Sequence, residues 1–218
     1  MPVPAQPKIY HILHVDRLAS VLADGRLWSD AMVQQRVSPG TTIGMSSIKA
    51  RRLQSALTSH PKLTVGECVP FYFCPRSIML YLIYQANHPE LTYRGGQGPI
   101  LHLECDLRAS IAWAEDQGRR WAFTLSNAGS FYFEDRAKIT QLDEINWEAV
   151  GATRWSGNGV DRSIKEGKQA EFLLEKSAPW ELVQRIGVGS RSIYQQVAGL
   201  LAGQTHRPKL EIIPDWYY

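Results

Sequence analysis

Apolar residues along the chain form short runs that follow two different spacings. A compact apolar and aromatic run, or strict alternation with polar residues, is typical of a β-strand. Runs of this kind predict strands at residues 9–13, 69–73, 100–105, 121–125, 170–174 and 182–186. Apolar positions three and four residues apart predict helices at residues 17–23, 78–85, 107–116, 142–150 and 190–201.

Capping residues and glycines mark where several of these elements begin and end. Asp16 is placed to cap the first helix, Gly25 to end it, and Ser77 to cap the helix that follows the second strand. The stretch 26–47 mixes Ser, Pro, Gly and Thr with few periodic apolar positions, and 151–167 is also rich in glycine. We expect both to be loops, and the first to be a long ordered loop that carries binding groups.

The order of elements determines the expected fold class. Strands are separated by helices, but without a regular strand–helix–strand period and without a GxGxxG fingerprint. This pattern indicates a mixed α+β fold rather than a doubly wound parallel sheet. A chain of 218 residues that is 44% hydrophobic can bury one substantial core, and no repeat or linker divides it, so we expect a single domain over residues 1–218.

Charge and cysteine content narrow the cellular setting. The net charge of +3 is a mild basic excess, compatible with a polyanionic partner but not diagnostic of one. The three cysteines show no paired CxxC spacing, so neither a disulfide framework nor a metal site is expected. No apolar run approaches the roughly 18 residues of a spanning helix, and the first eight residues lack the apolar core of a signal peptide. We expect a cytoplasmic protein without membrane contact.

The first candidate for chemistry is a pair of histidines in the first strand. Alternation places His11 and Leu13 on one face of the strand, and Ile12 and His14 on the other. A lone histidine on a strand is more often structural than a ligand, so the pattern alone does not favour function.

A second candidate is the basic sequence IKARR at residues 48–52, where Arg51 and Arg52 could bind phosphate oxygens bidentately. Such basic runs are usually solvated helix faces. A third is Arg76 with Ser77, which stand between an apolar strand and an apolar helix, where a helix N-terminus can receive an anion.

Two further pairs combine a cation with a neighbouring aromatic ring: Arg94 with Tyr93 in a glycine-rich turn, and Arg119 with Trp121. Each pair could stack on nucleic-acid bases, or the cation could belong to a strand edge and the ring to the core. The last candidate is Glu171, which alternation places on the strand face opposite Phe172. A carboxylate there is either an exposed edge charge or a site acid.

Taken in order, the segments IYHILHVDRLASVLADG, IKARR, VPFYFCPRSIMLY, HPELTYRGGQGPI and KQAEFLLE resemble the DarT family of DNA ADP-ribosyltransferase toxins. The resemblance covers nearly the whole chain. It implies the ADP-ribosyltransferase fold, a split mixed β-sheet with helices around an NAD cleft. It also implies transfer of ADP-ribose from NAD to thymine in single-stranded DNA, with guanine as the target of related members. The implied biological setting is a bacterial toxin–antitoxin pair, in which the macrodomain of the partner DarG removes the modification.

The resemblance also assigns roles to residues of this chain. His11 would bind the NAD ribose, and Glu171 would be the catalytic glutamate, stabilising positive charge on that sugar. Arg51 is matched first to the active-site arginine of the family, and the adjacent Arg52 is expected to bind NAD; one sequence does not determine which of the two side chains faces inward. The side chains of His11 and Glu171 are expected to converge on the same sugar. The remaining residues expected to bind NAD are Leu13, Tyr72 and Ser77.

The same resemblance identifies the stretch 150–167, just before the glutamate, as the substrate-recognising loop. Residues from this loop and from the aromatic and basic segments are expected to contact DNA: Arg76, Tyr93, Arg94, Arg119, Trp121, Arg154 and Trp155. Two alternatives stay open. The acceptor could be protein or RNA instead of DNA, because this fold serves many acceptors, or the chain could bind nucleic acid without catalysis.

Overall fold

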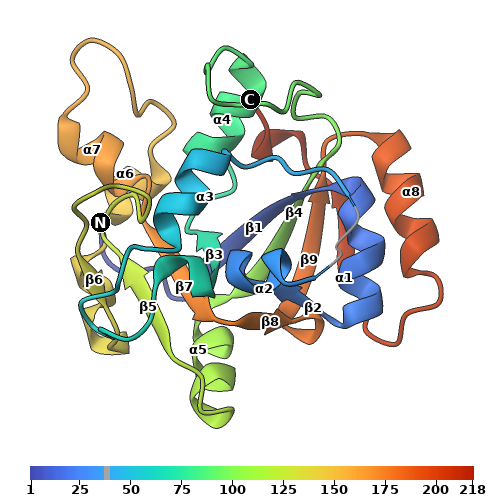
Figure 1. Cartoon of the computed structure of the whole chain (residues 1–218). Coiled ribbons are helices and arrows are strands. Elements are labelled where there is room, and N and C mark those ends of the chain that lie inside the picture. The colour runs from blue at the N-terminus through green and yellow to red at the C-terminus, as the bar shows by residue number, and fades with distance from the viewer. Residues whose placement is uncertain (37–39) are drawn as a thin grey trace.

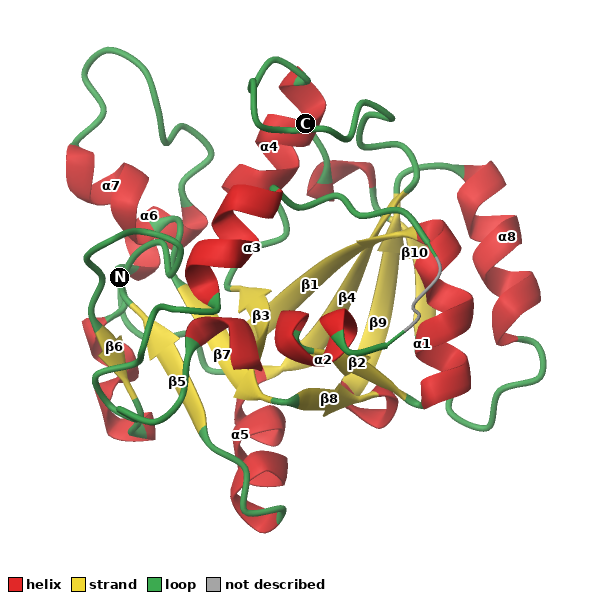
Figure 2. Cartoon of the chain, viewed as in Figure 1, coloured by secondary structure: helices red, strands yellow, loops and turns green. Residues whose placement is uncertain are grey.

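The fold is built on one large twisted β-sheet with helices packed around it (Figure 1, Figure 2). We describe it from a computed structural model, in which residues 1–36 and 40–218 are described. The eight strands of the sheet run in the order β10-β9-β4-β1-β3-β7-β5-β6. Only β9 and β10 pair in parallel among the described strands, and the others pair antiparallel, so the sheet is mixed. Their bounds are β1 (Lys8–His14), β3 (Cys68–Tyr72), β4 (Ile100–Asp106), β5 (Trp121–Thr124), β6 (Asp135–Arg136), β7 (Glu171–Glu175), β9 (Val183–Val188) and β10 (Lys209–Ile212).

The sheet is split between β1 and β3. Strand β1 pairs with β4 along its whole length, from Lys8 to His14. Its register with β3 consists of one pair, Tyr10 opposite Tyr72. Beyond that pair the two strands separate, and the expected split mixed sheet of an α+β fold is confirmed. A small second sheet of β2 (Arg26–Trp28) and β8 (Ser177–Pro179) lies beside the opening.

Eight α-helices and several 3-10 turns surround the sheet within the part of the chain that the structure describes. The helices are α1 (Leu18–Asp24), α2 (Asp30–Gln34), α3 (Ser46–Arg52), α4 (Ile78–Gln85), α5 (Leu107–Asp116), α6 (Trp147–Gly151), α7 (Arg162–Gly167) and α8 (Arg191–Leu201). None of the described helices is long and apolar enough to cross a membrane. The larger hydrophobic core lies on one face of the sheet, where Phe71, Phe123 and Phe172 are fully buried.

Strand β7 shows why both faces of the central sheet are buried. Phe172 and Leu174 point into the larger core, whereas Leu173 points into a smaller cluster with Ala122 and Leu57. The alternation expected for this strand is therefore confirmed, and it leaves Glu171 on the side of the smaller cluster. This glutamate is 3% exposed.

The six expected strands are present, with ends that differ by one or two residues. The helices α4 and α5 match their expected bounds at both ends, and α8 begins one residue after its cap, Ser190. The three helices could be predicted because each spans at least eight residues, which is long enough for a local pattern to be recognised in the sequence.

Four expectations about the remaining segments are wrong. Asp16 does not cap the first helix, because a 3-10 turn, Val15–Arg17, comes first and the Asp16 carboxylate accepts hydrogen bonds from Thr41 instead. Gly25 does end α1, in the left-handed conformation at φ 64°.

The stretch 26–47 is not a plain loop, since it holds β2, α2 and the start of α3, while its residues 37–39 lie outside the described part. The expected helix at 142–150 is a 3-10 turn, Ile139–Glu144, followed separately by α6. The expected loop at 151–167 ends in α7. Elements of three to six residues are too short to display a period.

Candidate active site

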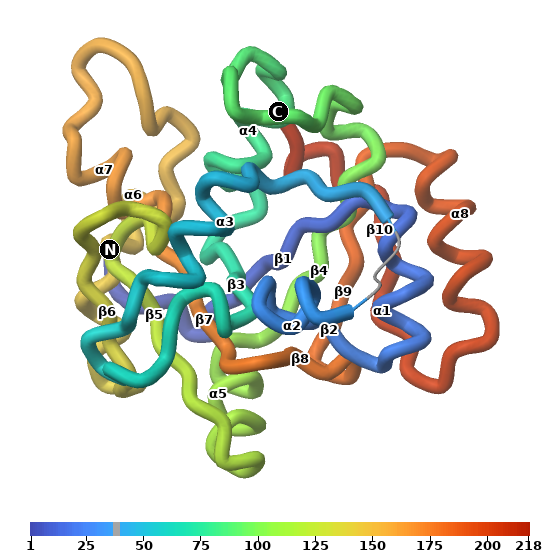
Figure 3. Tube along the Cα trace, viewed as in Figure 1, coloured from blue at the N-terminus to red at the C-terminus, as the bar shows by residue number. Residues whose placement is uncertain are grey.

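A cleft opens where β1 and β3 separate. It is lined by both strands and by α1, β2, α2, α3 and residues 41–45, and its empty volume is about 1280 Å³, part of which is open to solvent. Residues 41–45, which lead into α3 in Figure 3, line the cleft together with β1. The stretch expected to carry binding groups, 26–47, thus supplies much of the lining.

His11 lies on β1 inside this cleft. Its Nδ1 is 2.8 Å from the carbonyl oxygen of Pro70 on β3. A carbonyl only accepts, so Nδ1 is the donor in this hydrogen bond. Burial lowers the pKa of His11 below its usual value, which favours the neutral ring. Nε2 therefore carries a lone pair that can accept a hydrogen bond from a hydroxyl group.

Arg52 and Glu171 form a bidentate ion pair at the base of the cleft. Nη1 and Nη2 of Arg52 donate to the two carboxylate oxygens at 3.1 and 2.8 Å. Arg52, at the end of α3, is 9% exposed and lines the cleft, while Glu171 lies behind it at the start of β7. Burial alone would lower the pKa of Arg52, but the adjacent Glu171 charge raises it, so the arginine stays charged.

The strand registers determine where this pair lies. Tyr72 stands opposite Tyr10 on β1 and opposite Glu171 on β7. His11 and Glu171 are consequently two strands apart, at the same part of the sheet. The backbone N–H of Glu171 donates to Oγ1 of Thr124 at 3.1 Å, which fixes the start of the strand.

Two further groups complete the polar lining. Burial, together with the charge of Glu171, raises the pKa of Tyr72, so its phenol remains a hydrogen-bond donor. Asp30 on α2 forms an ion pair with Lys49 on α3, across the cleft from the strands. Asp30 was not identified from the sequence, because a single aspartate in an irregular segment carries no distinguishing signal.

The two adjacent arginines of α3 point in different directions. Arg52 binds Glu171, whereas the guanidinium carbon of Arg51 lies 5.0 Å from the centre of the Phe131 ring, outside the cleft lining. The structure brings Arg52 rather than Arg51 to the glutamate, since successive helix positions diverge by about 100°.

The other residues expected around the cofactor divide into two groups. Leu13 and Tyr72 line the cleft. Ser77 does not, because it is fully buried and its hydroxyl accepts a hydrogen bond from the backbone N–H of Leu80, capping α4. The serine acts as the helix cap that the sequence also suggested.

Two of the residues expected to contact DNA are buried. Trp121 and Trp155 are each 6% exposed. The indole of Trp121 packs against Phe172 in the core, and that of Trp155 packs edge-on against Tyr81 at 5.0 Å. Both indoles are therefore covered by protein, whereas Trp121 was expected to stack on a base and Trp155 to contact DNA.

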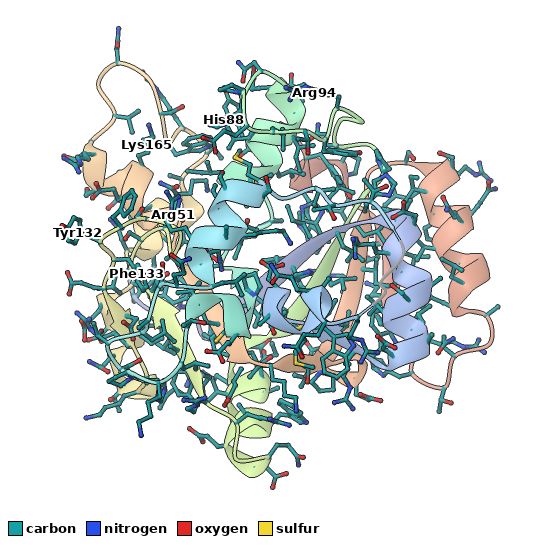
Figure 4. The ribbon with its side chains drawn as sticks, in the orientation of Figure 1. Arg51, His88, Arg94, Tyr132, Phe133 and Lys165 are labelled. Atoms are coloured by element: carbon teal, nitrogen blue, oxygen red, sulfur yellow. The ribbon has the colours of Figure 1, made fainter. Side chains whose placement is uncertain are left out.

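The five other expected DNA contacts are dispersed over the molecule. Arg76 lies over the ring of Tyr218, and Tyr93 donates a hydrogen bond from its phenol to Gly96. Figure 4 shows Arg94 at one end of the molecule, away from Arg51. Arg119 precedes β5, and Arg154 binds the carbonyl of Asn158 in an exposed loop. The segments of Arg76 and Arg154 are linked through ring contacts, because Tyr218 packs against Tyr81 and Tyr81 packs against Trp155.

Comparisons with known proteins agree with this arrangement. A family model described as "ssDNA thymidine ADP-ribosyltransferase, DarT" matches residues 10–218. A DNA ADP-ribosyl transferase of Thermus sp. (strain 2.9) is 35% identical, over 99% of this chain and 98% of the relative. The fold is similar to Thermus sp. 2.9 DarT in complex with ADP-ribosylated ssDNA, with a TM-score of 0.89 and 33% identity over 100% and 99% of the two chains. For the same protein in complex with NAD⁺ the TM-score is 0.83, at 32% identity over 99% of each chain.

The split sheet, the cleft with His11, and the buried Arg52–Glu171 pair thus occur in a chain that is similar to these proteins over its full length. The family match and the identity to the Thermus relative agree with the resemblance in the sequence segments. This chain belongs to the DarT family of ssDNA thymidine ADP-ribosyltransferases.

Proposed function

We propose that this protein transfers ADP-ribose from NAD to a thymine base in single-stranded DNA and releases nicotinamide. The observation that carries the proposal is the buried carboxylate of Glu171, held by Arg52 at the base of a cleft that His11 also lines. Buried charges without a structural need are typical of active sites. The family match and the similar Thermus structures with NAD⁺ and with ADP-ribosylated ssDNA support the choice of substrates.

Glu171 would stabilise the sugar that is transferred. Breaking the bond between nicotinamide and its ribose builds positive charge on that ribose, as in glycoside hydrolysis. A carboxylate has about four lone-pair sites, and Arg52 occupies two of them. The others can accept a hydrogen bond from the ribose 2′-hydroxyl, and the negative charge favours the transition state.

His11 and Arg52 would hold the substrate and the glutamate in place. Nε2 of the neutral His11 ring accepts a hydrogen bond from a ribose hydroxyl, while the Pro70 contact fixes the ring. Arg52 orients Glu171 through its two hydrogen bonds. Leu13 and Tyr72 would contact the dinucleotide from β1 and β3, because both line the same cleft.

Arg51 has a different place in the proposal. Arginine is a poor proton acceptor, so its charge would stabilise the anion that develops on the thymine ring or orient a DNA phosphate. N3 carries the only N–H of the thymine ring in DNA. As the bond from N3 to ribose forms, the bond from ribose to nicotinamide breaks, and the N3 proton would pass to solvent water.

The four arginines expected from the sequence would attract the DNA strand electrostatically, and Tyr93 would contact it through its ring. We keep Arg76, Tyr93, Arg94, Arg119 and Arg154 as candidate contacts, each accessible in part. Trp121 and Trp155 are left out because both are buried.

In the cell, the protein would act as the toxin of a pair whose antitoxin is a DarG macrodomain protein. DNA and NAD meet in the bacterial cytoplasm, which is where we place the reaction. Expression of the chain alone should arrest growth, and co-expression of a DarG macrodomain should restore it.

Incubation with NAD and a panel of oligonucleotides tests the reaction directly. We expect nicotinamide release that depends on thymine-containing single strands, and a mass increase of one ADP-ribose on the oligonucleotide. Labelling of protein or RNA in a mixed panel, with DNA unmodified, would favour a different acceptor. Salt-sensitive DNA binding without nicotinamide release would favour a non-catalytic binding domain.

A further inference from the structure

Two adjacent aromatic side chains, Phe131 and Tyr132, project into solvent from the loop between β5 and β6. Phe131 is 82% exposed and Tyr132 is 93% exposed. No other pair of neighbouring large apolar residues in the described parts of the chain is exposed to this extent. Figure 4 shows Tyr132 at the edge of the molecule. Exposed aromatic rings are unfavourable in water, and their grouping indicates a binding surface.

The loop that carries these rings has a fixed base. The backbone N–H of Leu125 donates to the carbonyl of Glu134 at 3.0 Å and closes the loop. Ala128, at its centre, is fully buried. The Asn127 side chain accepts from the backbone of Gly129 at 2.7 Å. The rings are therefore presented from an anchored turn.

The same loop is tied to the strand that carries the catalytic carboxylate. Nδ2 of Asn127 donates to Oε1 of Gln169 at 3.0 Å, two positions before Glu171. On its other side the loop touches α3, because a β-carbon at Gly129 would lie 3.0 Å from a methyl group of Ile48. The aromatic pair thus borders the site of transfer.

Arg51 faces this loop. Its guanidinium carbon is 5.0 Å from the centre of the Phe131 ring, and its Nε is buried without a hydrogen-bond partner. The Nε atom is covered by protein, but the residue as a whole is half-buried, and the terminal nitrogens of its planar guanidinium group suit a phosphate oxygen. Arg51 is next to Arg52, so this position adjoins the ion pair with Glu171.

The charges around the loop nearly cancel. Glu134 and Glu144 share the single guanidinium group of Arg136, which leaves one net negative charge, and Glu166 is paired with Arg162. Lys165 is exposed and has no ion pair among the described residues, and Figure 4 places it on the same side as Tyr132.

We propose that Phe131 and Tyr132 form a stacking subsite for a base that flanks the modified thymine, with Arg51 at the phosphate between them. The inference rests on the proposed function and adds a binding element to it. Aromatic rings beside a cation are the usual platform for single-stranded nucleic acid, because every base has a face that can stack. Flexible single strands expose that face, whereas duplex bases are already stacked.

Steady-state transfer kinetics with a single-thymine oligonucleotide test the subsite. The double variant Phe131→Ala, Tyr132→Ala should raise KM for the oligonucleotide about 5- to 100-fold, the usual range for loss of base stacking. KM for NAD should not change. The aromatic replacement Phe131→Trp, Tyr132→Trp should keep the low KM. Ile212→Ala is a matched control, because Ile212 is 44% exposed on β10, at the opposite edge of the sheet from β6.

A second oligonucleotide, with abasic sites on both sides of the thymine, separates stacking from a general effect of the mutations. Abasic sites should raise KM for the wild-type protein but add little for the double alanine variant. An unchanged KM in that variant, or an equal abasic effect in both proteins, would overturn the subsite while leaving wild-type transfer intact. Failure of the wild-type protein to transfer would instead overturn the proposed function, and the subsite with it.

Discussion

The guanidinium of Arg52 and the carboxylate of Glu171 are joined by two hydrogen bonds, at 3.1 and 2.8 Å, although 119 positions separate them in the chain. The pair connects the end of α3 to the start of β7, and both side chains are largely shielded from solvent. A buried ion pair of this kind usually contributes little net stability, because desolvation offsets the attraction. Its position at the base of the cleft is better explained by chemistry than by stability.

Removing the charge of Glu171 should stop transfer. We expect Glu171→Gln to lower the rate of nicotinamide release about 100- to 1000-fold, the usual effect of losing one group that stabilises transition-state charge. Glu175→Gln is the control, because Glu175 lies on the same strand but pairs with Arg120. Release assays with both variants check this. Equal rates for the two variants would remove Glu171 from the mechanism.

The two arginines of α3 should differ in their effect on stability. Arg52→Ala leaves a buried carboxylate unpaired and should lower the free energy of unfolding by about 3–5 kcal/mol. Arg51→Ala removes a cation–π contact with an exposed ring and should cost about 0.5–1 kcal/mol. Urea unfolding measures both values. A larger loss for Arg51→Ala would contradict the orientation of the two side chains described here.

His11 should contribute to NAD binding through Nε2. The variant His11→Phe keeps an aromatic ring but removes the acceptor, and a lost hydrogen bond of ordinary strength raises KM for NAD about 2- to 12-fold. His206→Phe is a control, because this ring binds the carbonyl of Val183 instead. NAD titrations at saturating DNA provide the measurement. An unchanged KM for NAD would show that the His11 ring binds only the carbonyl of Pro70 and does not bind NAD.

His102, on β4, should make the fold sensitive to acid. Burial lowers its pKa from 6.5 to about 4, although the hydrogen bond from Nε2 to the carbonyl of Pro75, at 3.0 Å, acts in the opposite direction. The unfolded chain then binds a proton at higher pH than the native protein. Stability is retained above pH 6.5 and lost as the pH falls towards 4, by roughly 3 kcal/mol.

The variant His102→Gln keeps a donor for Pro75 but does not titrate in this range. Its free energy of unfolding should therefore fall less than that of the wild type between pH 6.5 and 4. Urea unfolding at pH 7, 5.5 and 4 makes the comparison. The same slope for both proteins would assign the acid sensitivity to other groups.

The sequence by itself determined the long elements. Residues 107–116 carry a helical period and residues 78–85 form an apolar run after Ser77, and in the structure Ser77 and Asp106 cap the two helices, so local interactions specify where each helix begins. Strand β7 could be predicted because apolar positions alternate along it, and this alternation placed Glu171 on the face opposite Phe172. Several separate motifs were also enough to identify the family, because their order along the chain is specific.

Only the tertiary structure decided which side chains meet. Adjacent helix positions point in different directions, so the sequence could not tell Arg51 from Arg52, and the docking of α3 on β7 brought Arg52 to Glu171. In the sequence, a buried tryptophan near a cation cannot be told from an exposed one. Packing placed Trp121 in the core. The prominence of Phe131 and Tyr132 arises likewise from how their loop is anchored. Local patterns specify backbone conformation, but burial and contact depend on residues far away in the chain.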